Sequence, residues 1–186
     1  MNKTLMYLAG GLLLILGQAA VLHFFGQPFL CTCGVLKVWE GDVFSVGNSQ
    51  QLSDWYSFSH VIHGFLFYFF AWFLFPKAPA LQRLLLAIGL EMSWEILENT
   101  PWVINKYREQ ALAQGYVGDS IINSISDSLM MSFGFVLAWR FPVWSIVCIA
   151  LVFELFTGWA VHDNLTLNIL NFIHPFDFIT EWQSQA

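Results

Sequence analysis

The sequence predicts an all-α fold: a polytopic membrane helical bundle of about five transmembrane helices, in a single integral membrane domain over residues 1–186. Hydrophobic residues make up 57% of the chain and charged residues only 11%, against roughly 25% charged residues in soluble domains. Five segments also have the roughly 20 mostly apolar residues that a bilayer crossing needs. The composition excludes a disordered chain, and a net charge of −6 without a Lys/Arg run excludes nucleic acid as a partner.

Prolines divide the chain into these five segments. Pro76 and Pro79 separate the second from the third, Pro101 ends the third, and Pro142 separates the fourth from the fifth. The expected spans cover residues 4–25, 55–75, 81–99, 119–139 and 143–161.

The loops and the basic residues suggest an orientation. Four Lys/Arg residues lie on the side of the amino terminus, in very short turns, whereas the opposite side has long loops rich in acids. We therefore expect a cytoplasmic amino terminus, an outer cap loop before the second span, and a tail over 164–182 along the outer interface. The first segment has some features of a signal peptide, but its apolar run continues through Phe25, which favours a retained helix.

Acidic residues within the expected spans are the most informative feature of the chain. On insertion scales each costs roughly 2.5–3.5 kcal/mol near a helix centre, and six unpaired ones would cost on the order of 15–20 kcal/mol. They must therefore be paired, protonated, metal-bound or hydrated. The six are Glu91, Glu95, Glu98, Asp119, Asp127 and Glu154.

Their spacing is helical, so the polar residues of each span share one face. The third span has acids at positions i, i+4 and i+7, and the fourth has an acid, an amide and an acid at i, i+4 and i+8. The second span adds His60 and His63, with Ser57 one turn earlier. With the orientation above, these groups all lie in the outer half of the bilayer. The pattern predicts one polar pocket that opens outward.

Two histidines with several carboxylates form a donor set that suits zinc or iron. A metal-free general base, made by a His–carboxylate pair, is the alternative. The expected metal ligands are His60, His63, Glu95, Glu98 and Asp119. The same five residues and Asn123 are the expected catalytic residues. The expected substrate-binding residues are Arg108, Ser57, Glu91 and Asp127. Arg108 either holds an anionic headgroup or forms a salt bridge with an acid of the pocket.

Cys31 and Cys33 form a Cys-x-Cys motif in the expected outer loop. In an oxidising compartment the two thiols would form a disulfide or bind a soft metal.

Two resemblances follow from these residues. The order Asp54…His60-x-x-His63-Gly64, Glu91…Glu95…Glu98, Arg108 and Gly118-Asp119…Asn123 resembles the VanZ-like membrane proteins over the second to fourth spans. The stretches Cys31-Thr32-Cys33-Gly34, Trp94 to Pro101 and Gly118 to Ser124 resemble a bacterial inner-membrane family of unknown function. Both imply the same architecture and a bacterial inner-membrane location, and neither implies a substrate.

The sequence thus favours a membrane-embedded enzyme with a pocket that faces the periplasm. Its expected substrate is a lipid-linked molecule of the cell envelope, on which it hydrolyses or transfers an ester, amide or phosphate group. One alternative is a protein that binds or transports a metal ion, a proton or a lipid without turnover. Another is an assembly factor whose polar faces contact a second membrane protein.

Overall fold

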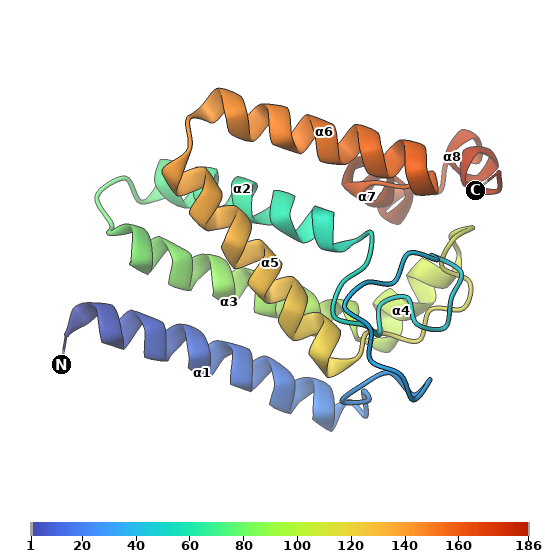
Figure 1. Ribbon diagram of the computed structural model, residues 1–186, viewed down its shortest axis with the longest axis horizontal. Coiled ribbons are helices and arrows are strands. Elements are labelled where there is room, and N and C mark those ends of the chain that lie inside the picture. The colour runs from blue at the N-terminus through green and yellow to red at the C-terminus, as the bar shows by residue number, and fades with distance from the viewer. Residues whose placement is uncertain (1, 186) are drawn as a thin grey trace.

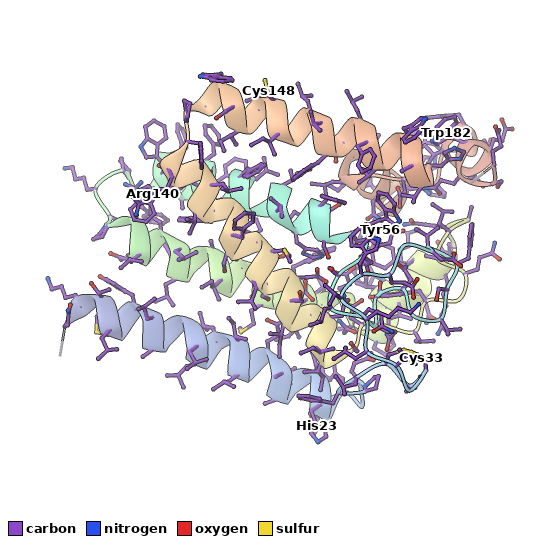
Figure 2. The ribbon with its side chains drawn as sticks, in the orientation of Figure 1. His23, Cys33, Tyr56, Arg140, Cys148 and Trp182 are labelled. Carbon is purple, nitrogen blue, oxygen red and sulfur yellow. A yellow bond between two sulfur atoms is a disulfide. The ribbon has the colours of Figure 1, made fainter. Side chains whose placement is uncertain are left out.

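The computed structural model describes residues 2–185, and over that range its helices are joined by loops, with no strand. Its elements are α1 Lys3–Phe24, α2 Ser57–Leu74, α3 Ala80–Glu98, α4 Pro101–Arg108, α5 Ile121–Arg140, α6 Val143–Val161, α7 Leu165–Ile173 and α8 Asp177–Gln183. The long helices lie side by side, while α4, α7, α8 and the long loops gather at one end (Figure 1). Figure 2 shows Cys33, Tyr56 and Trp182 at this end and Arg140 at the other. We call it the loop end.

Four helices are long and apolar enough to cross a membrane: α1, α2, α5 and α6. The third expected span does form a helix of 19 residues, α3, but its composition is too charged to qualify. Arg83, Glu91 and Glu95 are all buried in it, and α3 packs against α1, α2 and α5. The protein therefore has the expected all-α bundle, with four apolar helices and one charged helix that packs against three of them.

α5 lies at the centre of the bundle, whereas α6 lies at its edge. Half of the apolar window of α5 is buried, against 6% of that of α6. α1 is joined to α5 by the buried Gln18 side chain, which donates to the Ser124 carbonyl (2.9 Å) and accepts from the Ser128 hydroxyl (2.8 Å). Since a polar side chain is costly in an apolar environment, these two bonds fix how α1 sits against α5.

α2 and α5 cross at a pair of glycines. A Cβ atom on Gly64 would lie 2.1 Å from the Met131 carbonyl oxygen, and one on Gly134 would lie 2.1 Å from the Val61 carbonyl oxygen. The two backbones are therefore in direct contact, which only residues without a side chain permit. This crossing places the polar residues of α2 and α5 close together.

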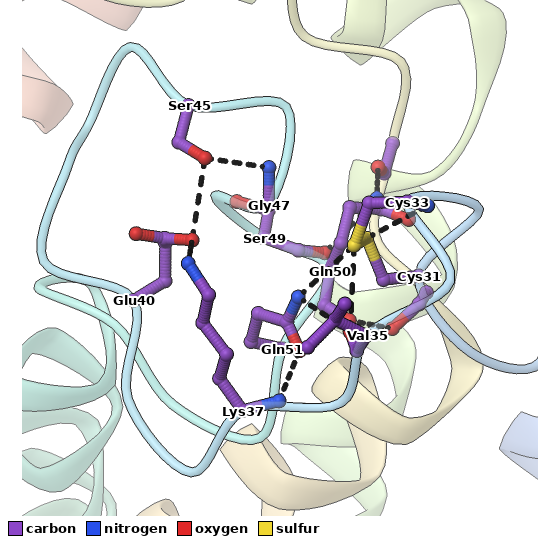
Figure 3. The surroundings of a disulfide bond; sticks show 12 residues. Cys31, Cys33, Val35, Lys37, Glu40, Ser45, Gly47, Ser49, Gln50 and Gln51 are labelled. Carbon is purple, nitrogen blue, oxygen red and sulfur yellow. Dashed lines mark hydrogen bonds and ion pairs between the residues drawn. A yellow bond between two sulfur atoms is a disulfide. The ribbon is translucent and has the colours of Figure 1, made fainter.

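The loop before α2 forms the expected cap. The buried Gln51 side chain accepts from the Lys37 amide (2.7 Å) and donates to the Val35 carbonyl (3.0 Å), beside a disulfide between Cys31 and Cys33 (Figure 3). The disulfide is the first of the two states expected for this motif. The Gln50 side chain donates to the Gly118 carbonyl (2.7 Å), so the cap is also bonded to the segment before α5.

Tail helices α7 and α8 pack back on the loop end through Asp163. This buried carboxylate accepts from the Tyr56 hydroxyl (3.3 Å) and the Gln183 side-chain amide (3.1 Å). It therefore joins the N-terminus of α2 to the C-terminus of α8. Glu154 of α6 accepts from the backbone amides of Leu165 and Thr166 at the start of α7 (3.0 and 3.1 Å). Glu154 thus caps α7. The expectation that it joins the polar cluster of α2, α3 and α5 was wrong.

Burial raises the pKa of Asp163 from 3.8 to about 6, so the folded state binds a proton at this carboxyl more readily than the unfolded state does. Because the folded pKa is the higher one, the stability from this group is complete below about pH 4 and is lost as the pH rises through 6. Acidification from pH 7.5 to 5 is expected to stabilise the wild type by about 1 kcal/mol more than Asp163→Asn. Thermal unfolding of both proteins in detergent measures the difference, and equal pH profiles would contradict it.

Candidate functional site

A cavity of about 590 Å³ opens at the loop end. Its polar floor comes from α2, α3 and α5, and its walls come from the cap loop, α4, α7 and the segment between α4 and α5. No Lys or Arg of residues 2–185 lines it. The ionisable groups that line it are Asp54, Tyr56, His60, His63, Glu98, Tyr107, Tyr116, Asp119 and Asp127.

Glu91 holds both histidines of the floor. Its carboxylate is fully buried and lies 2.5 Å from Nδ1 of His60 and 3.2 Å from Nδ1 of His63. A carboxylate accepts hydrogen bonds, so Nδ1 is the donor in each ring and Nε2 is left for another partner. A carboxylate behind the imidazole is the usual arrangement for a metal-ligating or catalytic histidine.

Asp127 faces the other nitrogen of His60. Its Oδ2 lies 3.9 Å from His60 Nε2, while its Oδ1 accepts from the Ser57 hydroxyl at 3.1 Å. Glu95 lies beneath the floor, with its Oε1 3.5 Å from His60 Nδ1. Donor atoms of His60, Glu95 and Asp127 all lie within 4.8 Å of one another, close enough to surround one metal ion.

Asp119 also lines the cavity, and hydrogen bonds to Asn99 and Tyr116 hold it in place. Its carboxylate accepts from the Asn99 side-chain amide (2.8 Å) and from the Tyr116 hydroxyl (2.9 Å), and its backbone amide donates to Oδ1 of the Asn99 side chain (2.7 Å). Burial raises the pKa of Asp119 from 3.8 to about 6, against the opposing effect of these bonds. Glu95, Glu98 and Asp119 form another group with donor atoms within 4.8 Å of one another.

Nine of the ten expected site residues lie at the floor or directly beneath it. Asn123 lines the cavity and donates to the Gln51 carbonyl at 2.9 Å, so it connects the floor to the cap. Arg108 is the exception: it is exposed, does not line the cavity, and donates to the Tyr116 carbonyl at 2.6 Å. Its guanidinium therefore secures the segment after α4. Among the described residues Arg108 forms no salt bridge to an acid of the pocket.

Sequence reasoning missed four groups of the site. Asn99, Tyr107 and Tyr116 belong to α4 or to the segments next to it, and α4 was not expected as an element. A signal for α4 was present, because Thr100 precedes Pro101 and its side chain accepts from the third residue of the helix. Asp54 lines the cavity from a position three residues before α2, and its carboxylate accepts from the Ser49 and Tyr56 backbone amides.

Away from the floor, apolar side chains form part of the cavity lining. They are Phe44 and Val46 of the cap loop, Trp94 of α3, and Phe172 and Ile173 of α7. A polar floor below an apolar mouth fits a ligand with a polar head and an apolar remainder better than a free ion or a sugar.

Comparison with known proteins places this site in a bacterial family. Relatives include UPF0314 proteins of Agrobacterium fabrum (51% identical over 95% of this chain and 88% of that protein), Rhizobium meliloti (53%, over 90% and 85%) and Sphingopyxis alaskensis (50%, over 89% and 88%). No solved structure matches the chain. The VanZ-like order of residues stays a resemblance in pattern. The family described as "Protein of unknown function (DUF2585)" matches residues 22–185, and the chain belongs to that family.

Proposed function

We propose that this protein is a metal-dependent enzyme of the bacterial inner membrane that acts on a lipid-linked substrate of the cell envelope. The single observation that carries the proposal is the grouping of His60 and Asp127, which line an amphipathic cavity, with Glu95 directly beneath them. In this proposal the amino terminus is cytoplasmic and the loop end faces the periplasm, in agreement with the distribution of basic residues.

The donor set supports a divalent transition metal such as zinc or iron. One imidazole and two carboxylates leave coordination positions free for water or substrate, as catalytic metal sites require. Glu91 supports the site from behind, because its bond to His60 Nδ1 directs Nε2 toward Asp127. The sequence had assigned Asp127 to substrate binding, and the geometry favours it as a ligand.

His63 is suited to act as the general base. Glu91 orients its ring through Nδ1, and the side chain lines the cavity next to His60. In the proposed hydrolysis His63 accepts a proton from water, and the water oxygen bonds to the phosphorus or carbonyl carbon. The bond to the leaving group breaks, and His63 returns the proton to that leaving group. Transfer to a second substrate would follow the same course, with a hydroxyl group in place of water.

The substrate class follows from the walls. A headgroup on the polar floor would leave its apolar part among Phe44, Val46 and Phe172, where burial of an acyl or polyprenyl chain is favourable. A membrane lipid can reach such a cavity by lateral diffusion, which a soluble substrate cannot.

Metal analysis of the detergent-purified protein, prepared without chelator, tests the proposal. Near-stoichiometric zinc or iron is expected in the wild type and in His23→Ala, whose side chain is exposed on α1. It is expected to be lost from His60→Ala and from the milder Glu95→Gln. Absence of metal from the wild type would overturn the metal-dependent function.

Incubation with extracted envelope lipids, followed by mass spectrometry, tests turnover. A headgroup product that depends on the metal and disappears in His63→Ala is expected. Lipid that co-purifies with the metal-loaded protein but is never converted would overturn catalysis in favour of a binding protein.

A further inference from the structure

Three groups among residues 2–185 could hold a metal ion, and two of them share one carboxylate. Glu95 belongs to the group formed with His60 and Asp127 and also to the group formed with Glu98 and Asp119. The second group lies beside the first, and Glu98 and Asp119 both line the cavity. A carboxylate between two donor sets is placed as a bridging ligand is in two-metal enzymes.

The Glu95 side chain provides an independent sign of a missing ligand. Its Oε1 is buried, and it has no hydrogen-bond partner among residues 2–185. His60 Nδ1 lies 3.5 Å from this oxygen, but it is already bonded to Glu91 at 2.5 Å. A buried carboxylate oxygen without a partner is costly, so such atoms usually mark a place where an ion or water binds.

The charge of the cluster also favours more than one cation. The two groups and the histidine-holding Glu91 contain five carboxylates, and no Lys or Arg of the described chain lines the cavity. One divalent ion with neutral imidazoles balances two negative charges, whereas two ions balance four. Since isolated buried charge is strongly unfavourable, the second ion removes most of the remaining imbalance.

Asp119 is already oriented to bind. The Asn99 amide and the Tyr116 hydroxyl each donate to one of its oxygens, which fixes the carboxylate but leaves lone pairs on both. The second group offers only oxygen donors, which suit a hard ion such as Mn²⁺ or Mg²⁺ better than a soft one.

We propose that Glu95, Glu98 and Asp119 form a second divalent-cation site and that Glu95 bridges it to the site at His60 and Asp127. This inference rests on the proposed function and deepens it. Two ions about 3.5–4 Å apart would clamp both the attacking and the leaving oxygen of an in-line displacement. A dinuclear centre would therefore make a phosphate ester of a lipid the favoured substrate class.

Reconstitution with Mn²⁺ tests the second site. Manganese is counted by elemental analysis, and its electron paramagnetic resonance spectrum reports whether the ions are coupled. The wild type is expected to bind two Mn²⁺ per chain with a coupled spectrum. Asp119→Asn is expected to bind one, with the six-line spectrum of an isolated ion. Asp42→Asn, an exposed acid of the cap loop, is the matched control and should keep both ions.

The outcomes separate the two proposals. One Mn²⁺ in the wild type, or two uncoupled ions in Asp119→Asn, would overturn the second site and leave the first. No bound metal in the wild type would overturn both. If Asp119→Asn is not monodisperse in detergent, Glu98→Gln replaces it, because Glu98 is less buried and belongs to the same group.

Discussion

Gly64→Ala is expected to destabilise the protein by about 3 kcal/mol or more, a larger effect than a single added methyl usually has. The new Cβ would lie 2.1 Å from the Met131 carbonyl oxygen and 2.5 Å from the Phe135 amide nitrogen. Both are backbone atoms of α5, so no side chain can rotate away, and the two helices must move apart. Gly134→Ala is expected to act in the same way from the opposite helix, through Val61.

Thermal unfolding in detergent, followed by size-exclusion chromatography, measures this effect. Gly17→Ala is the matched control, because its Cβ would meet nothing within 4 Å and alanine favours a helix. Gly17→Ala should therefore be neutral or slightly stabilising. A Gly64→Ala protein as stable as this control would show that α2 and α5 do not cross as described.

The glycine contact also matters for the site. Ser57 and His60 on α2 approach Asp127 on α5 because the two backbones touch near Gly64. Gly64→Ala should thus weaken metal binding even in detergents where the protein remains folded. Weaker binding would reflect a wider His60–Asp127 separation rather than a changed ligand.

Helical periodicity was enough to predict the floor of the cavity. Glu91, Glu95 and Glu98 recur at helical spacing, and so do Asp119 and Asp127. Because an unpaired carboxylate is costly in a membrane, these groups were expected to lie close together. The bundle places them together, and the short turns at prolines set the helix boundaries to within about two residues.

Residues outside the long helices were predictable only in part. Arg108 and Glu154 were assigned by their charge and their end of the bundle, but each instead binds nearby backbone, in the segment before α5 and at the start of α7. Such local bonds depend on loop conformation, which periodicity does not encode. For the same reason Asn99 and Tyr116, which hold Asp119, were not identified.

The number of spans shows a similar limit. α3 has the length of a transmembrane helix, yet its buried Arg83, Glu91 and Glu95 remove it from the apolar class. Arg83 and Glu91 are tolerated because each has a partner. Arg83 donates to the Phe75 and Pro76 carbonyls of the turn before α3, and Glu91 binds the two histidines of α2. The long helix with the least membrane-like composition therefore supplies three acids of the site, Glu91, Glu95 and Glu98.

Glu91→Leu is expected to cost about 3–5 kcal/mol of stability, the second large effect in this protein. Glu91 is completely buried and bonds Nδ1 of both His60 and His63, so its loss leaves one buried and one half-buried imidazole without their acceptor. Glu91→Gln keeps the shape and one acceptor oxygen, and should be milder in stability. Its metal affinity should nevertheless fall by about 10–100-fold, as is usual when the group behind a ligating histidine is altered.

Unfolding in detergent and metal titration of the same preparations distinguish the two roles of Glu91. Glu109→Gln is the matched control, because Glu109 is exposed and its pair with Lys106 (2.8 Å) is worth no more than about 1 kcal/mol. If Glu91→Gln binds metal as tightly as Glu109→Gln does, Glu91 serves only the packing of α2 on α3. If its affinity falls while its stability is nearly unchanged, Glu91 orients His60 as a metal ligand, because packing alone would not separate the two measurements.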